Sequence, residues 1–367
     1  MESRKLNVGV IGVNIHRGWG GNVHLPALLK LPEYQVIGVC TTREESSKES
    51  AKHFDVPMAF SNYEDLVHHP DIDVVSVCVS VPLHHQMVLT AIKAGKHVYC
   101  EWPLAVTVSE AEEMAAAASQ TSMTHMVGLQ LRCSPVLLYL KELVKEGYIG
   151  KVLSCNMNAS VSNTTYIEPR LAWEVDKEKG AHVLSIPAGH TLDVISYCIS
   201  DFVEINGQVT TQLTKRTVAG TTTELTVTSP DHVSVTGTLA NGAVVSAHIA
   251  RAIWHGTGWS LEVYGTEGTL VASSESLPQL SPIIHLNGAR HDEKTLHAID
   301  TPNRLRWAPL ELDGVEPLAT AQMYRSLANA IKSGEATHPN FDDALHHHRL
   351  LAAIETSSNS GKRISLI

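Results

Sequence analysis

The stretch Leu6-Asn-Val-Gly-Val-Ile-Gly12-Val-Asn14-Ile-His-Arg-Gly18-Trp-Gly20 decides the fold of the N-terminal half. An apolar run of strand-forming residues leads into a glycine-rich loop, and a helical pattern follows. In this context the loop can bring backbone N–H groups and a helix N-terminus to a pyrophosphate. Asn14 takes the place of the second glycine of Gly-x-Gly-x-x-Gly, and Asn tolerates the left-handed backbone of such a turn. The motif predicts dinucleotide binding, with a plain strand-to-helix turn as the alternative.

The alternation of short apolar segments with helical patterns continues to about residue 130. The strand candidates are Leu6–Gly12, Gln35–Thr41, Asp73–Ser80, His97–Glu101 and His125–Gln130. The helix candidates are His24–Leu31, Glu44–His53, His84–Ala94 and Val108–Gln120. Buried strands separated by helices indicate a parallel sheet covered on both faces, and right-handed crossovers make it doubly wound. We predict an α/β chain whose residues 1–132 form a dinucleotide-binding Rossmann domain.

Longer segments, several of them alternating apolar with polar residues, follow a helix at Pro135–Lys145. They are Lys151–Val161, Phe202–Leu213, Val233–Leu239, Ala243–Ala250 and Ser260–Tyr264. Asn241-Gly242 is a strong hairpin signal, and Gly265–Gly268 is typical of another turn. We predict that residues 133–367 form an α+β domain with a large, mainly antiparallel sheet. A helix near His182–Cys198 is expected to cover one face of that sheet.

The chain changes character again after about residue 272. Residues 273–318 are rich in Pro, Ser and Gly, which predicts a long surface excursion. Helical patterns follow at Ala319–Ser333 and Phe341–Ser358, and the last helix could alternatively pack back on the first domain. His346-His347-His348 lies in that last helix. Consecutive helix residues point in different directions, so we predict no metal site there.

Composition excludes several classes of function. Hydrophobic residues make up 43% and charged residues 18% of the 367 residues, which is typical of a packed globular protein. The net charge of −10 includes no basic patch, so we predict no direct nucleic-acid binding. No run approaches the roughly 18 apolar residues of a membrane span, and the start lacks the apolar stretch of a signal peptide. We expect a cytoplasmic protein, or a nuclear one if it regulates genes through a protein partner.

The end of the second strand bears on the choice between NAD and NADP. NAD sites usually place an acidic residue there to hold the ribose 2′-hydroxyl, and none is present. Thr42 and Arg43 offer a hydroxyl and a guanidinium to a 2′-phosphate, so NADP is favoured and NAD is the second choice. Alternatively, Arg43 only starts the next helix. Pro82 and His85 follow the third strand, where many such folds close over the cofactor, although the proline could simply end the strand.

Several segments carry a resemblance to a known family. They are the opening glycine loop, Val81–His85, Ala94–Ala105 and Gly189–Asp193. With these segments the whole chain resembles the glucose–fructose oxidoreductase/inositol dehydrogenase (Gfo/Idh/MocA) family. A second set is similar to the fungal branch that contains the galactose-pathway repressor: Gly18-Trp19, His24–Leu28, Leu129–Pro135 and Gly147–Gly150.

The resemblance implies an NAD(P) site, a homodimer built through the C-terminal sheet, and a choice between catalysis and sensing. The implied cofactor residues include Gly12, Gly18, Trp19, Glu101 and Trp102. The chain also departs from the family pattern, because Trp102 stands where the family has a lysine that contacts the reacting hydroxyl. An indole N–H donates a hydrogen bond but exchanges no proton near neutral pH, so Trp102 can stack on the nicotinamide but cannot act as acid or base. Ile186 likewise replaces the family's usual aspartate.

His190 and Asp193 remain as catalytic candidates. The unperturbed pKa of histidine, near 6.5, suits proton transfer, and Asp193 lies one helical turn onward, where it could orient the ring. A histidine at a helix start with a structural carboxylate is the equal alternative. Further candidates lie in segments that line the family's substrate cleft: Tyr166 and Lys177 as catalytic replacements for the lost lysine, and Arg132 and Trp173 as substrate contacts. Arg132 could equally pair with a structural carboxylate.

Three functions fit these observations. The first is an NADP-dependent oxidoreductase acting on a sugar-like, polyhydroxy or cyclic carbonyl compound. The second is a cofactor-sensing regulator without turnover that works through a protein partner. The third is a redox-neutral lyase or isomerase that uses a bound nicotinamide. The frequency of oxidoreductases in the family places the first ahead, although a fold does not settle function.

Overall fold

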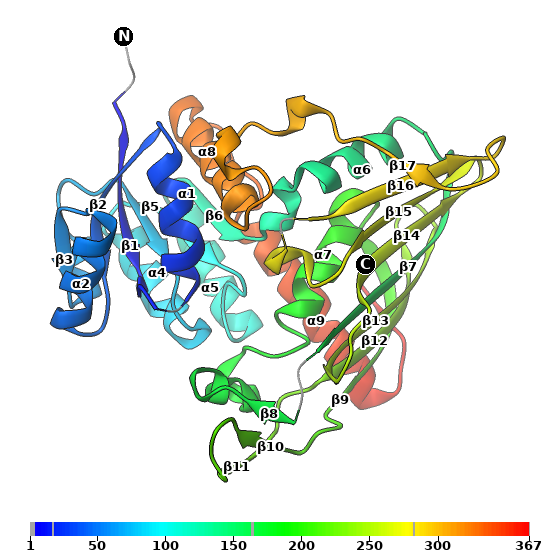
Figure 1. Ribbon diagram of the computed structural model, residues 1–367, viewed down its shortest axis with the longest axis horizontal. Helices are drawn as coiled ribbons and strands as arrows, with labels where there is room; N and C mark the ends of the chain where they lie inside the picture. The colour runs from blue at the N-terminus through cyan, green and yellow to red at the C-terminus, as the bar shows by residue number, and fades with distance from the viewer. Residues whose placement is uncertain (1–3, 17, 163–164, 282, 367) are drawn as a thin grey trace. The chain divides into compact units, whose positions relative to one another are not determined.

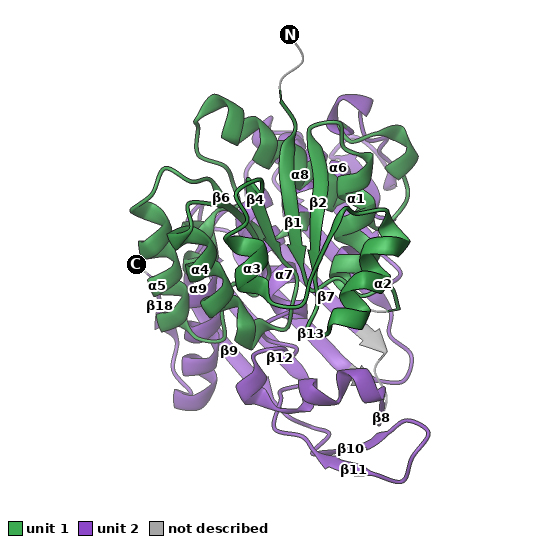
Figure 2. Ribbon diagram, turned by 90° about the vertical axis from the view of Figure 1, so that its left-hand side faces the viewer, with its two compact units in different colours: residues 1–130, 307–346 green, residues 131–306, 347–367 purple. Residues whose placement is uncertain are grey.

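The computed structural model describes residues 4–16, 18–162, 165–281 and 283–366 (Figure 1). The chain divides into two compact units, which Figure 2 shows in different colours. Unit 1 comprises Met1–Gln130 and Trp307–His346, and unit 2 comprises Leu131–Arg306 and His347–Ile367. The predicted division has a single boundary at 132/133, and the first boundary between the compact units lies at 130/131. The prediction differs in assigning residues 307–346 to the second domain.

Unit 1 is built on a six-stranded sheet in which every neighbouring pair is parallel. The strand order is β3 (Met58–Phe60), β2 (Tyr34–Cys40), β1 (Leu6–Ile11), β4 (Val74–Val77), β5 (His97–Glu101) and β6 (His125–Gly128). All four residues of β4 are buried, as expected for a strand covered on both faces. The chain reverses its direction of travel across the sheet between β1 and β4, and this switch point is where such folds bind ligands.

The helices of unit 1 follow from local sequence signals. They are α1 (Leu25–Lys30), α2 (Glu44–Phe54), α3 (Tyr63–Val67), α4 (His84–Lys93), α5 (Val108–Ser119), α8 (Pro317–Ser333) and the start of α9 (Phe341–Ser360). A capping box formed by Thr107 and Glu110 begins α5. Helices α3, α4 and α5 pack in succession, and α8 packs against α1. Helix α8, far along the chain, thus completes the unit that begins at the N-terminus.

Unit 2 is built on a nine-stranded sheet. Its order is β17 (His297–Ala298), β16 (His285–Arg290), β15 (Gly268–Ser274), β14 (Gly258–Gly265), β7 (Val152–Ser162), β13 (Val244–Ile253), β12 (His232–Leu239), β9 (Phe202–Thr210) and β18 (Ile364–Ser365). Only the β7–β13 pair is parallel among these described strands. The hairpin predicted at Asn241-Gly242 joins β12 to β13, and Gly242 has a φ of +85°. The fold class predicted from the sequence is confirmed.

One face of this large sheet is apolar and the other is polar. Along β13, Val245, Ala247 and Ile249 are buried, whereas Ser246 and His248 are exposed. Among the described residues, three α-helices belong to this unit: α6 (Pro135–Lys145), α7 (Pro187–Cys198) and most of α9. A small second sheet contains β11 (Glu224–Thr226), β10 (Lys215–Val218) and β8 (Tyr166–Ile167).

Several parts of the chain differ from the sequence prediction, which named no strand at β8, β10, β11, β15 or β18. Strand β3 has only three residues, too few for a recognisable pattern, so the predicted five-strand sheet has a sixth. Residues 273–318 are not a simple surface excursion, because β16 and β17 extend the nine-stranded sheet at its edge. The Gly and Pro content that predicted a loop reflects the short turns around these strands. No helix in the described part of the chain is long and apolar enough to cross a bilayer.

Candidate functional site

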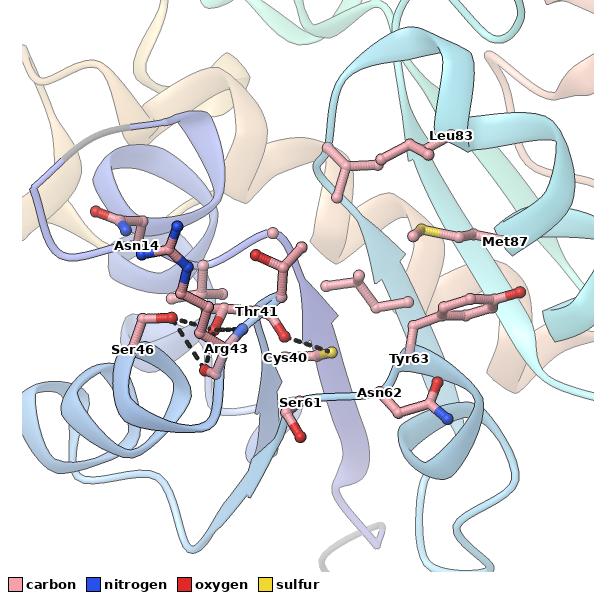
Figure 3. A pocket seen from close by; sticks show the side chains of 15 residues that line it. Asn14, Cys40, Thr41, Arg43, Ser46, Ser61, Asn62, Tyr63, Leu83 and Met87 are labelled. Carbon is pink, nitrogen blue, oxygen red and sulfur yellow. Dashed lines mark hydrogen bonds between the residues drawn. The ribbon is translucent and has the colours of Figure 1, made fainter. Parts of the chain in front are cut away.

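A pocket of about 440 Å³ opens at the carboxyl ends of β1, β2, β3 and β4 in unit 1 (Figure 3). Each of these strands contributes the residues that follow it, so the parallel sheet itself assembles the wall. The lining residues are Ile11, Gly12, Val13, Asn14, Cys40, Thr41, Thr42, Arg43, Ser46, Ser61, Asn62, Tyr63, Val79, Leu83 and Met87. The predicted cofactor residues Gly12, Asn14, Thr42 and Arg43 thus come together in one place.

The glycine loop is held by backbone-to-backbone contacts that leave no room for side chains. Gly12 has a φ of +96°, and a Cβ there would lie 2.1 Å from the carbonyl oxygen of Cys78. A Cβ on Gly20 would lie 2.7 Å from the Gly12 oxygen. The Asn14 side chain accepts a hydrogen bond of 2.9 Å from the His16 N–H, which closes the turn. Asn14 therefore fills the second glycine position as a turn-forming residue.

Gly18 and Trp19 do not line this pocket. Gly18 has a φ of +91°, a backbone conformation that favours glycine. No atom of the described residues lies within 4 Å of the position that a Cβ would take, so neighbouring atoms would not exclude a side chain there. The tight contacts of this part of the loop are made by Gly20 and by Gly21, whose Cβ would lie 2.3 Å from the Asn14 oxygen. The longer loop moves the close approach of backbones past the position that the standard motif indicates.

The turn after β2 carries hydroxyl groups and a guanidinium but no carboxylate. Thr41 Oγ1 and Ser46 Oγ are 2.6 Å apart, and Ser46 Oγ donates to the Arg43 oxygen at 3.0 Å. Figure 3 shows the Arg43 side chain extended towards Asn14 along the pocket wall. Glu44, the nearest acid in the sequence, is paired with Lys48 at 2.5 Å and does not line the pocket. This turn can therefore hold an anionic group better than a neutral hydroxyl.

Pro82 and His85, predicted to close over the cofactor, do not line the pocket, whereas Leu83 and Met87 do. His85 Nε2 lies 2.8 Å from Glu113 Oε2 instead. Its neighbour His84 is buried, with Nδ1 at 2.9 Å from the Pro103 oxygen and Nε2 at 3.0 Å from the Val79 oxygen. Consecutive residues of a helix point in different directions, so His84 and His85 at the start of α4 have different surroundings although they are adjacent in the sequence.

The Glu101-Trp102-Pro103 segment begins at the last residue of β5 and ends in a cis peptide bond. Trp102 is buried, and Glu101 Oε1 lies 2.9 Å from His24 Nε2. Burial opposes protonation of His24, but the neighbouring Cys78 and Glu101 outweigh it and raise the pKa of His24 to about 10. A buried imidazolium therefore balances the Glu101 carboxylate.

A hydrogen-bonded chain continues from this ion pair into α8. His24 Nδ1 lies 2.7 Å from the Tyr324 hydroxyl, which lies 2.6 Å from Ser76 Oγ. Gly128 leaves space for the carboxylate, because a Cβ there would lie 2.5 Å from Glu101 Oε1. The sequence gives no sign of this network, because His24 and Tyr324 are 300 residues apart.

In unit 2, Asp193 is paired with Arg132 rather than with His190. Arg132 donates from Nη2 to Asp193 Oδ1 at 2.7 Å and from Nε to Oδ2 at 3.0 Å. The Asp193 side chain is 1% exposed, so this is a buried two-point ion pair of the structural kind that we gave as the alternative. We predicted that Asp193 orients the His190 ring. In the structure both oxygens of Asp193 accept hydrogen bonds from Arg132 instead, so the carboxylate serves as the counter-charge of that guanidinium.

His190 is buried at the start of α7. Burial lowers the pKa of His190 to about 4, with Asp193 opposing and His347 reinforcing the shift. Its Nδ1 atom has no hydrogen-bond partner among the described residues. His347 Nε2 lies 2.7 Å from the Gly189 oxygen, next to His190 in the chain. A neutral imidazole with one unsatisfied buried nitrogen can accept or donate one hydrogen bond to a bound molecule.

The other predicted residues of unit 2 lie on separate elements. Tyr166 is 55% exposed on β8, and Trp173 is half-buried in a short 3-10 helix, Pro169–Val175. Lys177 forms an ion pair with Glu355. The Lys177 ammonium is therefore paired with a carboxylate of α9, and this contact does not support the predicted catalytic role of Lys177.

Sequence reasoning missed the pocket residues that follow β3, namely Ser61, Asn62 and Tyr63. A Ser-Asn pair before a helical pattern is a recognisable cap, since Asn62 accepts from the Glu64 N–H at 2.9 Å, but β3 itself went unrecognised. Within the described residues, no group of three or more His, Cys, Asp or Glu side chains is placed to hold a metal ion.

A parallel sheet of this order, with a glycine turn after β1 and a pocket along the strand ends, defines a dinucleotide-binding Rossmann protein. Residues 6–129 match the model of the oxidoreductase family with an NAD-binding Rossmann fold, and residues 135–274 match that of the Gal80p C-terminal domain. The chain belongs to the Gfo/Idh/MocA oxidoreductase family and is close to its Gal80-like members.

Relatives include both enzymes and regulators. The chain is 28% identical to levoglucosan dehydrogenase of Pseudarthrobacter phenanthrenivorans, over 76% of each chain. It is 29% identical to the galactose/lactose metabolism regulatory protein GAL80 of Kluyveromyces lactis, over 66% of this chain but only 57% of the regulator. The crystal structure of an oxidoreductase domain protein from Kribbella flavida covers 100% of both chains with a TM-score of 0.86 and 25% identity.

Proposed function

We propose that this protein is an NADP-dependent oxidoreductase that acts on a sugar-like, polyhydroxy or cyclic carbonyl compound. The pocket after β1–β4 fits a dinucleotide, because the glycine turn at Gly12 and Asn14 lines it at the strand ends, and the absence of a Cβ on Gly12 allows the close approach of the Cys78 carbonyl that shapes this turn. A bound nicotinamide supplies or accepts the hydride. The observation that carries the choice of NADP is the turn after β2, where Thr42 and Arg43 line the pocket and no carboxylate does.

Cofactor titration tests this choice. We expect Arg43→Ala to weaken NADPH binding about 10- to 100-fold, since a charge-assisted hydrogen bond contributes roughly 1.5–3 kcal/mol. NADH binding should change little, because its ribose carries a neutral hydroxyl. Lys48→Ala is a matched control that removes a cation from the same helix outside the pocket. Equal loss of NADPH and NADH affinity in Arg43→Ala would contradict the assignment to the 2′-phosphate.

We assign the proton-accepting role to His190. Trp102 cannot exchange a proton near neutral pH, whereas His190 is neutral there and has a buried nitrogen without a partner among the described residues. Such a ring can accept the proton of a substrate hydroxyl as hydride leaves the same carbon. Asp193, Tyr166 and Lys177 remain predictions. Arg132 and Trp173 stay predicted substrate contacts.

Absorbance at 340 nm with a panel of sugars, cyclitols and cyclic ketones tests turnover. We expect His190→Ala to lower kcat by about 10²–10⁴-fold with little effect on NADPH affinity. His285→Ala, which removes an exposed histidine of the same unit, should leave kcat unchanged. Absence of turnover over the whole panel, with tight NADPH binding, would count against the enzyme.

A second candidate is a cofactor-sensing regulator that acts through a protein partner. The match to the Gal80p C-terminal domain and the tryptophan at position 102 favour it. Affinity capture from the source cell, with and without NADPH, distinguishes the two functions. A transcription factor recovered in a cofactor-dependent manner supports the regulator, and metabolic enzymes alone oppose it.

We also propose a homodimer formed through the polar face of the nine-stranded sheet. Asn156, Ser246 and His248 lie exposed on adjacent strands of that face, where hydrogen-bonding groups could meet a second copy. Light scattering after size-exclusion chromatography measures the mass. Ser246→Arg should convert a dimer to a monomer, whereas a monomeric wild-type protein would refute the proposal.

A further inference from the structure

A second cavity, of about 410 Å³, lies within unit 2. Its walls come from four places: α6, the start of β7, the end of α7 and the turn between β12 and β13. Lys141 and Lys145 of α6, Lys151 just before β7, Tyr197 of α7 and Asn241 of the turn line it. None of these residues takes part in the cofactor pocket or in the contacts of His190 described above.

The charge of this cavity is unusual for a chain with a net charge of −10. Three lysines line it, and no aspartate or glutamate does. Within the described residues, none of the three ammonium groups forms an ion pair, whereas Lys48, Lys177 and Lys215 each pair with a glutamate. The three unpaired cations create a local positive potential that would attract an anion.

The position of Lys141 strengthens this point. Lys141 and Lys145 are four residues apart on α6, where like charges repel each other on the same helix face. Lys141 Nζ lies 3.4 Å from the centre of the Tyr197 ring, and the Arg132 guanidinium lies 5.2 Å from the same ring. Burial lowers the pKa of Lys141, and Arg132 and Lys145 act in the same direction, while Cys198 and Asp193 oppose the shift. An anion in the cavity would relieve this repulsion.

Stabilisation of a helix C-terminus explains only part of the arrangement. Lys145 lies in the last turn of α6, where a cation favours the helix dipole. Lys141 lies one turn earlier, and Lys151 lies beyond the helix, so the dipole accounts for neither. The convergence of all three on one cavity requires another reason.

The remaining walls indicate the kind of anion. Val144 and Ile199 supply apolar surface, while the Asn241 amide and the Tyr197 hydroxyl supply hydrogen-bonding groups. A cavity of this volume falls in the range of small-molecule sites. Apolar surface beside several cations suits an organic body that carries charged groups, more than a bare inorganic ion.

We propose that this cavity of unit 2 binds a small organic anion that carries at least two carboxylate or phosphate charges, held by Lys141, Lys145 and Lys151. The site is independent of the proposed oxidoreductase function. Lys141 and Lys145 lie one helical turn apart on α6, Lys151 follows that helix, and the Tyr197 ring holds the Lys141 ammonium at the wall.

Isothermal titration calorimetry on the full chain, with and without excess NADPH, tests the proposal. The probes are citrate, glucose 6-phosphate and uncharged glucose at low salt. We expect at least one anion to bind with an affinity that NADPH does not change, and glucose to give no heat. Citrate binding alone assigns a carboxylate ligand, and glucose 6-phosphate binding alone assigns a phosphate ligand.

The variant Lys141→Gln/Lys145→Gln/Lys151→Gln should weaken anion binding by at least about tenfold, because it removes charge-assisted hydrogen bonds. Lys294→Gln, an exposed lysine elsewhere in unit 2, should leave binding unchanged. Thermal unfolding checks that the triple variant is folded, and relief of repulsion should keep its Tm at or above the wild-type value. Absence of binding by both anions up to millimolar concentrations, or equal binding by the two variants, overturns the proposal.

Discussion

Removal of the Arg132 side chain should destabilise unit 2 far more than removal of an exposed arginine. Arg132 satisfies both oxygens of Asp193, and the Asp193 side chain is 1% exposed. In Arg132→Gln the carboxylate loses its counter-charge while it stays buried. Loss of one partner of a buried ion pair costs about 3–5 kcal/mol. For a unit of this size, each kcal/mol lowers Tm by roughly 2–4 °C, so we expect a decrease of roughly 6–20 °C.

Arg304→Gln provides the matched control. Arg304 also makes a two-point contact with a carboxylate, that of Glu142, but these side chains are 58% and 32% exposed. Solvent screening limits such a pair to about 0–1 kcal/mol. The double variant Arg132→Gln/Asp193→Asn should regain most of the lost stability, since two neutral amides replace the unpaired charge.

Urea unfolding followed by circular dichroism measures all four proteins at pH 7. Our reasoning is refuted if Arg132→Gln stays within about 1 kcal/mol of the wild type, or if it loses no more than Arg304→Gln. Failure of Asp193→Asn to restore stability would show that the cost arises from lost packing against Tyr197 rather than from the buried charge.

Three further predictions concern unit 1 and the pH response. Gly12→Ala should abolish NADPH binding in calorimetry, because its Cβ would lie 2.1 Å from a backbone oxygen, whereas Gly95→Ala, at a positive φ in open space, should keep it. Burial lowers the pKa of His190 from 6.5 to about 4, so the unfolded chain binds the proton more tightly. The stability that the neutral His190 contributes to the folded state is complete above pH 6.5 and is lost as pH falls towards 4. In urea unfolding, His190→Gln should therefore show a smaller decrease in stability from pH 7 to pH 5 than the wild type. An equal decrease in the two proteins contradicts this. Tyr324→Phe keeps the ring stacked on Tyr99 but removes the hydroxyl between His24 and Ser76. The free energy of unfolding, measured in urea, should therefore decrease by about 1–3 kcal/mol. An unchanged midpoint would show that this chain of hydrogen bonds contributes nothing to stability.

Most of the secondary structure could be predicted from the sequence because its signals are local. The predicted segment at His97–Glu101 coincides with β5, and that at Pro135–Lys145 coincides with α6. Runs of buried residues with a period near 2 or 3.6 depend only on neighbours in the chain. Among the exceptions, β3 is too short to show a period, and β16 and β17 lie among Pro and Gly residues. Strands β8, β10, β11, β15 and β18 were not predicted either.

The candidate cofactor pocket was predictable in part for the same reason. Gly12, Asn14, Thr42 and Arg43 each lie at the end of a predicted strand or within two residues after it, and parallel strands bring their carboxyl ends to one edge. The exact contacts of the loop could not be predicted, because its extra residues move the close approach of backbones to Gly20.

By itself, the sequence determined which residues form strands and helices, and it placed a glycine turn at the end of the first strand. The tertiary structure alone decided which polar side chains meet. Arg132 holds Asp193 from 61 residues away, and Tyr324 reaches His24 across 300. Pairing at such separations depends on how whole elements pack, because a buried charge takes whichever partner the fold brings within hydrogen-bond distance, and no local pattern records that choice.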